Sequence, residues 1–313
     1  MSVILLGLNV VTPLFIVMLI GYITRRAGLI NDNVVGATNR LLFWIFLPSI
    51  LFVSVYETDL AKAFNVALIL YSVIGTTLIF LAGMVLVPRF EKVRSRCGVI
   101  IQALIRGNEV YFGFPVLVSL IGAEYLGPMS IVIVFAVISF NTYSIVALEY
   151  FKGEKVNIKE LILNVLKNPM ILTTIAAVML NMTGIRIPFM IMSGIKSLSQ
   201  VATPFALFLL GASFNIVSTR KYIKQVIWVS LLRLFIIPAI VVLTTVWMGF
   251  SPTDTVILFV TFGVPAAVAG YSMAREMNAD YELASQFVVF TTAFSLLSIF
   301  IWTVVFQFVG IIQ

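Results

Sequence analysis

The clearest chemical signal in this chain is a short motif that occurs twice. FGFP ends at Pro115 and FGVP ends at Pro265, so the two copies lie 150 residues apart (265 − 115). Glycine adds backbone freedom, whereas proline removes a hydrogen-bond donor and collides with the preceding helical turn. We therefore expect Gly113 and Pro115, like Gly263 and Pro265, to interrupt helices at corresponding places in two halves of the chain. Matched interrupted helices are typical of the substrate sites of secondary transporters.

Polar and charged residues come directly before the first motif. Arg106, Asn108, Glu109 and Tyr111 lie within an apolar stretch, and charged groups inside a membrane normally face a cavity or a partner. Arg106 and Glu109 are three residues apart, so a continuous helix would bring them together as an ion pair. The alternative is that the helix unwinds over 111–115, and that the freed backbone groups and these side chains line a substrate site.

The predicted breaks favour an anion. Each proline would start a new helix, near Val116 and near Ala266, and the first N–H groups of a helix are unpaired and partially positive. A carboxylate placed there gains hydrogen bonds without a formal cation, and the amide of Asn108 is a further donor. Arg233 is a candidate counter-ion, although we favour the alternative that it bonds a backbone carbonyl or extends to the membrane surface.

Other polar residues within apolar stretches are weaker candidates. Asn141 and Thr291 occupy matching positions at the same offset of 150, and Tyr271 follows the second motif. We expect these three to line the site, although hydroxyl groups in membranes also simply join helices. Because the chain has no histidine, proton coupling would need a carboxyl group such as that of Glu109, or the substrate itself.

Composition sets the class of the protein. Of its 313 residues, 61% are hydrophobic and 11% are charged, whereas soluble domains carry roughly 25% charged residues. The chain is therefore expected to be an all-α integral membrane protein. With no histidine and the single cysteine Cys97, it offers no histidine zinc site, no histidine-activated nucleophile and no internal disulfide. We predict neither an enzyme nor a cofactor, and we interpret the net charge of +7 as a matter of membrane topology and not of nucleic-acid binding.

Ten hydrophobic segments are each long enough to cross a bilayer. Their approximate limits are 3–23, 34–56, 64–88, 97–122, 127–151, 160–182, 188–215, 222–249, 253–275 and 281–310. We divide the chain into a first repeat at 1–151, a short linker at 152–159 and a second repeat at 160–313. Five spans per repeat invert the second repeat relative to the first. The spacing of 35 between Pro13 and Pro48 recurs between Pro169 and Pro204, an offset of 156 (169 − 13) that also supports a duplication.

The basic residues predict the orientation. They concentrate in one set of alternate loops, at 25–40, 89–96, 152–167, 220–224 and 275, whereas the opposite set holds about three. Loops rich in lysine and arginine stay in the cytoplasm. We therefore expect a multi-pass protein of the cell membrane with both termini outside. Separately, Gly75, Gly83 and Gly211 are expected to allow close approach of neighbouring helices.

Three stretches resemble one known family over essentially the whole chain. They are NRLLFWIFLP at 39–48, NEVYFGFP at 108–115, and VPAAVAGYSMARE at 264–276 followed by DYELASQ at 280–286 and TTAFS at 291–295. In these the chain resembles the auxin efflux carrier family, which includes plant auxin carriers and bacterial malate and malonate permeases. The plant carriers have an Asn-Pro-Asn crossover and a long central loop, and this chain has neither. The resemblance is therefore closer to the bacterial organic-acid branch.

The resemblance implies a fold of ten transmembrane helices in two inverted repeats. Helices 1, 2, 6 and 7 would form a scaffold, often a homodimer interface. Helices 3–5 and 8–10 would form a mobile transport domain in which the broken helices 4 and 9 cross. The family's carboxylate site, at the crossover prolines and an adjacent asparagine, matches Pro115, Pro265 and Asn108 here.

These expectations together indicate a secondary transporter of small organic anions, either mono- or dicarboxylates, that works by alternating access. Arg106 and Arg233 are its possible charge partners. The alternatives are a membrane sensor that binds a ligand without moving it, and an anion channel. The expected partners are the organic anion and the lipid bilayer.

Overall fold

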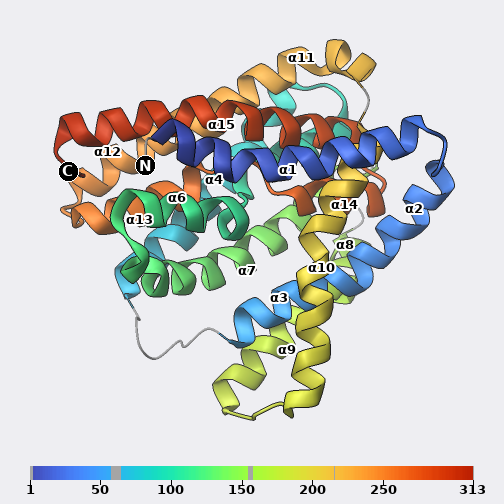
Figure 1. Ribbon diagram of the computed structural model, residues 1–313, viewed down its shortest axis with the longest axis horizontal. Helices are drawn as coiled ribbons and strands as arrows, with labels where there is room; N and C mark the ends of the chain where they lie inside the picture. Colours follow the sequence, from blue (N-terminus) through green and yellow to red (C-terminus); the bar gives the residue numbers. More distant parts are fainter. Residues whose placement is uncertain (1–2, 58–64, 154–157, 215, 313) are drawn as a thin grey trace.

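The computed structural model describes residues 3–57, 65–153, 158–214 and 216–312 (Figure 1). Within these ranges it describes only the backbone of residues 3–11, 111, 158, 160–161, 164–165 and 216–218. Within the described ranges, six continuous helical stretches are long and apolar enough to cross a membrane: Asp32–Tyr56, Val66–Phe90, Ala123–Tyr150, Phe189–Ser213, Thr219–Trp247 and Tyr281–Val309. The protein is therefore an all-helical, multi-pass membrane protein, as its composition predicted.

The helices follow the ten predicted apolar segments. In the first half they are α1 (Val3–Arg26), α2 (Asp32–Leu41), η1 (Leu42–Phe46), α3 (Leu47–Tyr56), α4 (Val66–Phe90), α5 (Arg94–Ile105), η2 (Glu109–Gly113), α6 (Phe114–Ile121), η3 (Ala123–Tyr125) and α7 (Leu126–Tyr150). In the second half they are α8 (Ile158–Lys167), α9 (Pro169–Thr183), α10 (Phe189–Ser213), α11 (Ile216–Leu231), η4 (Leu232–Ile236), α12 (Ile237–Trp247), α13 (Pro252–Gly263), α14 (Val268–Glu276) and α15 (Tyr281–Val309).

Three of these helices contain a π turn directly before a proline. The turns η1, η2 and η4 lead into α3, α6 and α12, whose second residues are Pro48, Pro115 and Pro238. Proline offers no N–H to the carbonyl four residues before it, and its ring collides with that carbonyl. A wider turn relieves this conflict, because its hydrogen bonds span five residues, as from the N–H of Phe114 to the carbonyl of Glu109. The expectation that the chain unwinds over 111–115 was therefore wrong, since this stretch stays helical.

The two broken segments are interrupted elsewhere, and the interruptions cross. One extended piece, 106–108, joins α5 to η2, and the other, 264–267, joins α13 to α14. They form an antiparallel bridge at Gly107 and Ala266. The N–H of Asn108 donates to the carbonyl of Pro265 at 2.9 Å, and the N–H of Ala267 donates to the carbonyl of Arg106 at 3.2 Å. The interruptions of the predicted segments 4 and 9 thus meet at this bridge.

The crossing also corrects the internal register. The bridged residues are 159 positions apart (266 − 107), which is closer to the proline offset of 156 than to the motif offset of 150. Pro115 lies inside a helix, whereas Pro265 lies in the extended piece between two helices. The two FGxP motifs therefore do not mark equivalent places, and helices near the site begin at Glu109 and Val268 instead of at Val116 and Ala266.

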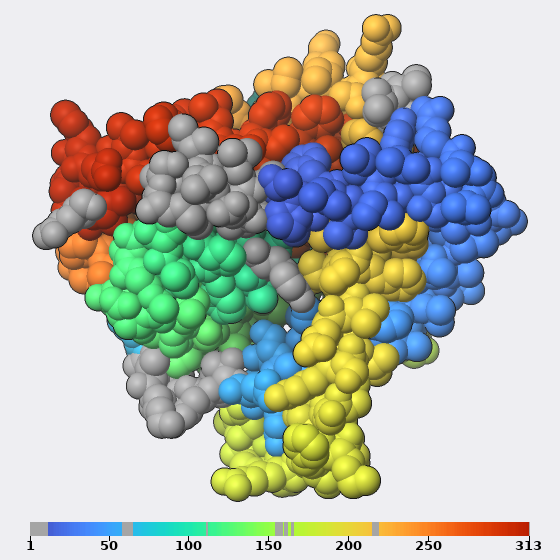
Figure 2. All heavy atoms as spheres, viewed as in Figure 1, coloured from blue at the N-terminus to red at the C-terminus, as the bar shows by residue number. Residues whose placement is uncertain are grey.

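The helices pack in two neighbourhoods on either side of this crossing. Helix α10 packs against α1 and α3, and α3 packs against α9. In Figure 1, α3, α9 and most of α10 lie in the lower part of the molecule and α1 runs across its upper part, and Figure 2 shows α9 and the beginning of α10 projecting together at the lower tip. In the rest of the molecule α4, α5 and α7 pack together, α12 packs against α13, and α15 packs against both α11 and α14.

The outer surface is apolar where lipid would cover it. Side chains such as Phe189, Trp247 and Phe308 are 84%, 86% and 92% exposed. A soluble protein rarely presents so much contiguous apolar surface, whereas a bilayer solvates it. The buried interior, in contrast, contains polar side chains close to the crossing.

Helices α1 and α10 make the closest backbone contact, through two glycines. A Cβ atom added to Gly211 would run into the carbonyl of Met18, and one added to Gly21 would run into the carbonyl of Phe208. The expectation for Gly211 is confirmed, and Gly75 and Gly83 are also tight, with added Cβ atoms 2.9 Å from the ring of Phe262 and 3.1 Å from Ile101. Small residues at such contacts let membrane helices associate.

This contact predicts the effect of one substitution. Gly211→Val should force α1 away from α10 and lower the thermal unfolding temperature of the purified protein, with a cost of about 1–3 kcal/mol as for other overpacked sites. Gly194→Val is the matched control, since Gly194 lies in the same helix and an added Cβ atom would meet open space. Equal unfolding temperatures for the two variants would contradict the contact.

Candidate functional site

A cavity of about 100 Å³ lies beside the crossing. One wall comes from the crossing and from α7, and consists of Arg106, Gly107, Asn108, Glu109, Val110, Val137, Phe140, Asn141, Ala267, Val268 and Ala269. The opposite wall comes from α3, α9 and α10, and consists of Leu47, Ile50, Leu51, Ser54, Met170, Thr203 and Ala206. The cavity therefore separates the broken segments from the neighbourhood of α3, α9 and α10, and its polar groups gather on the side of the breaks.

Arg233 holds the two broken segments together from the side. Its residue is fully buried, and its guanidinium donates through Nε to the carbonyl of Val264 at 2.9 Å and through Nη1 to the carbonyl of Leu104 at 2.6 Å. Those carbonyls belong to the ends of α13 and α5, where helices leave acceptors unpaired and carry partial negative charge. The favoured expectation, that Arg233 satisfies backbone carbonyls, is confirmed. Arg233 does not line the cavity.

Arg106 lies in the extended piece 106–108, and its guanidinium is not paired with a carboxylate of the described residues. In the described part of the chain no carboxylate oxygen lies within 4.0 Å of its guanidinium, so the contact ion pair with Glu109, one of the two interpretations of the sequence, is not formed. The helical spacing that would have paired them is lost, because the chain is extended at 106–108. Arg106 lines the main cavity and also a smaller one of about 10 Å³, which is roughly the space of one water molecule.

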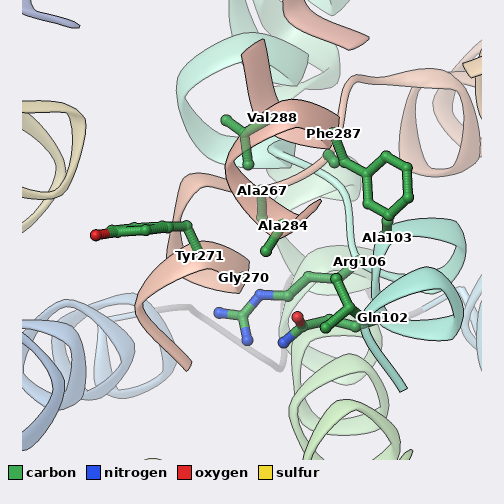
Figure 3. Close-up of a pocket in the computed structure, with 11 residues that line it drawn as sticks. Gln102, Ala103, Arg106, Ala267, Gly270, Tyr271, Ala284, Phe287 and Val288 are labelled. Atoms are coloured by element: carbon green, nitrogen blue, oxygen red, sulfur yellow. The ribbon is translucent and has the colours of Figure 1, made fainter. Parts of the chain in front are cut away.

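A thioether is the one hydrogen-bond acceptor that the described structure gives the side chain of Arg106. Its Nη1 donates to the sulfur of Met273, which also accepts from the amide of Gln102 at 3.6 Å. Figure 3 shows the guanidinium and this amide side by side near Gly270, in the smaller cavity. Sulfur is a weak acceptor, so the guanidinium of Arg106 keeps most of its capacity to bind an anion.

Three more polar side chains on the cavity wall have unused groups. Asn141 is 2% exposed, and neither its amide nitrogen nor its amide oxygen has a partner. One oxygen of the Glu109 carboxyl, Oε1, is likewise unpartnered, and the side-chain amide of Asn108 makes no hydrogen bond to any described residue. Unpaired buried polar groups cost about 1–3 kcal/mol each. Three such atoms, in Asn141 and Glu109, lie at this one cavity and point to a polar ligand or to water that satisfies them.

Other predicted residues support the site from outside the cavity. Thr291 holds the crossing in place, since its hydroxyl accepts from the N–H of Ala266 at 3.0 Å and donates to the carbonyl of Phe287 at 2.6 Å. Tyr271 is fully buried and lines only the smaller cavity, and its hydroxyl bonds to Ser213 and Arg275. These contacts make both side chains positioning residues.

The glycines and prolines of the two FGxP motifs do not line the cavity. Gly113 and Gly263 lie at tight contacts, where an added Cβ atom would be 3.0 Å from Met129 and 3.1 Å from Phe259. Pro115 shapes the π turn, and Pro265 contributes its carbonyl to the crossing. Neither proline lines the cavity. The backbone of Tyr111 lies in η2, but its side chain falls outside the described residues.

The C-terminal half of helix α14 is also hydrogen-bonded to α2 and η1. The amide of Asn39 donates to the carbonyl of Ser272 at 3.2 Å, and the indole N–H of Trp44 donates to the carboxylate of Glu276 at 3.3 Å. The stretches 39–48 and 264–276, which carry two parts of the family resemblance, therefore meet in space. These bonds join α2 and η1 to α14 on one side of the cavity.

Sequence reasoning did not single out the residues of the second wall of the cavity. Leu47, Leu51, Met170 and Ala206 are apolar residues in apolar helices, so nothing in their types or spacing distinguished them from lipid-facing neighbours. Thr203 offered a weak signal, because it directly precedes Pro204 within α10.

The two bonds of Arg233 predict its effect on stability. Arg233→Met should lower the unfolding temperature of the ligand-free protein strongly, because two buried carbonyls lose their donor at about 1–3 kcal/mol each. Arg220→Gln is the control for charge removal, since Arg220 is exposed on α11, the helix that precedes η4. An unfolding temperature unchanged by Arg233→Met would show that the arginine is not structural.

Comparison with known proteins supports the same class. A family model described as membrane transport protein matches residues 7–303. An uncharacterized transporter of Methanocaldococcus jannaschii, MJ1031, is 24% identical over 307 residues, which cover 95% of this chain and 98% of that protein. An uncharacterized transporter of Methanothermobacter thermautotrophicus is 24% identical over 298 residues, covering 94% of this chain and 97% of that protein.

A further relative carries a substrate in its name. A protein from Rhizobium meliloti, whose name suggests malonate transport, is 22% identical over 298 residues, which cover 93% of each chain. Because the family model spans nearly the whole sequence, this chain belongs to the membrane transport protein family, which is the auxin efflux carrier family, and is a membrane transporter.

Proposed function

We propose that this protein is a secondary transporter of small organic anions, mono- or dicarboxylates, that works by alternating access. The observation that carries the proposal is the cavity beside the crossing, where Arg106, Asn108 and the unpaired amide of Asn141 meet. A cation and amide donors together suit a carboxylate. No comparable set of donors lines the large apolar groove between α4 and α12.

The backbone adds to this preference for an anion. Helix η2 continues into α6 from Glu109, and α14 starts at Val268, so two helices begin at the cavity wall. The first N–H groups of a helix carry roughly half a positive charge. A carboxylate bound between them would take its main charge contact from Arg106 and hydrogen bonds from Asn108 and Asn141.

The substrate class follows from this chemistry and from one relative. The Rhizobium meliloti protein whose name suggests malonate transport is aligned over 93% of this chain. At 22% identity this supports a small carboxylate in general, and the cavity volume of about 100 Å³ fits molecules of that size.

For the mechanism we propose the division that the family implies. The scaffold would comprise α1–α3 and α8–α10, and the transport domain would comprise α4–α7 and α11–α15. These are ten spans in two inverted repeats at 1–151 and 160–313, with the linker 152–159 between them. Both termini would lie on the outer side of the cell membrane, and a second copy of the chain would pack on the scaffold. The cavity lies at the proposed boundary, since one wall comes from each part.

Movement would then require contacts at that boundary to break. The bonds from Asn39 to Ser272 and from Trp44 to Glu276 cross it on one side of the cavity. We propose that these bonds close that side, and that their release opens the cavity toward the membrane face on which they lie.

One counterflow experiment distinguishes a carrier from a channel and from a sensor. Proteoliposomes loaded with unlabelled malonate should accumulate external radiolabelled malonate transiently, because a carrier exchanges one molecule for another. The uptake should saturate with concentration. Uptake that grows linearly without counterflow would indicate a channel, and binding without any uptake would indicate a sensor.

The role of Arg106 gives a further prediction. Arg106→Gln should weaken malonate binding roughly 10- to 100-fold, as expected for the loss of a hydrogen bond to a charged group, and should leave the unfolding temperature of the free protein nearly unchanged. Arg89→Gln removes the same charge at an exposed site in the last turn of α4 and should bind normally. Normal malonate affinity in Arg106→Gln would exclude this arginine from the site.

A further inference from the structure

Glu109 is the one carboxyl group on the cavity wall. It is 4% exposed and is the first residue of η2. In the described ranges no arginine or lysine nitrogen lies within 4.0 Å of its carboxyl oxygens. Its Oε1 atom also has no hydrogen-bond partner. A carboxylate in lipid-like surroundings is normally paired or hydrogen-bonded at every lone pair, so this group is poised to exist in either protonation state.

Both arginines near Glu109 are bonded to other groups, although one nitrogen of Arg233 stays unpaired. Arg233 uses two nitrogens for the carbonyls of Leu104 and Val264, and its unpaired Nη2 and Glu109 Oε1 lie beside Gly107, where both would meet an added Cβ atom. Arg106 bonds to Met273 and opens onto the cavity.

The remaining elements around the cavity add no titratable side chain. Helix α7 contributes the neutral Asn141, α14 contributes its first residues Val268 and Ala269, and α3, α9 and α10 contribute apolar and hydroxyl side chains. The charge balance at the cavity is therefore set by the two arginines, Glu109 and the helix ends.

An approximate balance of these charges can be drawn up. The ends of α5 and α13 carry about half a negative charge each, which together offset Arg233. The starts of η2 and α14 carry about half a positive charge each, and Arg106 adds one full charge. With Glu109 ionised, the empty site is then about +1, and with Glu109 protonated it is about +2. A net charge buried away from water is costly, so the first state suits a monoanion and the second suits a dianion.

We propose that Glu109 takes up one proton when a doubly charged carboxylate binds, and that a singly charged carboxylate binds without this proton. The proton comes from water, forms an O–H bond on the carboxyl of Glu109, and returns to water when the dianion leaves. The site would then carry one proton with each dianion. This inference rests on the proposed function, since it concerns the charge state of the same cavity.

Calorimetry can count the proton directly. Malonate and acetate are titrated into the full-length protein in nanodiscs at neutral pH, where malonate is a dianion, in two buffers of different ionisation enthalpy. The difference in apparent binding enthalpy between the buffers gives the number of protons taken up. We expect about one proton per malonate and about none per acetate, in line with the charge balance.

Two variants assign the proton to its residue. Glu109→Gln has the size and neutral charge of the protonated side chain, so it should bind malonate without proton uptake. Glu124→Gln removes an exposed carboxyl in η3, outside the cavity, and should keep the proton uptake of the wild type. If Glu109→Gln fails to fold, Glu109→Asp retains a titratable group and should retain the uptake.

The possible failures are distinct. Malonate binding to the wild type without proton uptake, or uptake that persists in Glu109→Gln, would overturn this inference and leave the transporter proposal standing. If neither malonate nor acetate binds the wild type at all, the proposed carboxylate site fails, and the role of Glu109 fails with it.

Discussion

The crossing of the two interrupted segments depends on the guanidinium of Arg233. Two helix ends that point toward each other inside a membrane bring unpaired carbonyls and like partial charges together. Arg233 donates to a carbonyl from each of them, at Leu104 and at Val264, and so supplies both hydrogen bonds and compensating charge. Only arginine has a rigid, always charged group that can reach two acceptors in this way. The bridge between Gly107 and Ala266 and the support from Thr291 then fix the extended pieces.

The polarity of the cavity comes from the groups that the bonds of Arg233 do not involve. Arg233 satisfies the negative helix ends, so Arg106, the asparagine amides and the two helix starts remain without full partners. One arginine is thus used for structure, and a second lines the cavity. The same fold that holds the breaks open places their polar groups against apolar side chains of α3, α9 and α10. A ligand in that position touches both neighbourhoods of the molecule, as a carrier requires if its occupancy is to bias their relative position.

Much of this arrangement was visible in the sequence, and the failures have local physical causes. The apolar segments, the glycine contact at Gly211 and the position of Asn108 and Glu109 next to a helix break followed from residue type and length. The position of the first break did not, because a π turn lets a helix accept Pro115, whereas Pro265 of the matching FGxP motif lies in an extended piece. The pairing of Arg106 with Glu109 assumed a continuous helix that stops at Ile105. The roles of Thr291 and Arg233 depend on contacts across 25 and 129 residues, which no local pattern encodes.

The central claim is that Arg106 binds the anion while Arg233 remains on the helix ends. An experimental structure of the protein with bromomalonate would test it most directly, because bromine gives an anomalous signal that locates the ligand. We predict a peak in the cavity lined by Asn108 and Asn141, with a ligand carboxylate on Arg106 and with Arg233 still bonded to Leu104 and Val264. A ligand carboxylate on Arg233, with those two carbonyls released, or a bromine peak outside this cavity, would contradict the account.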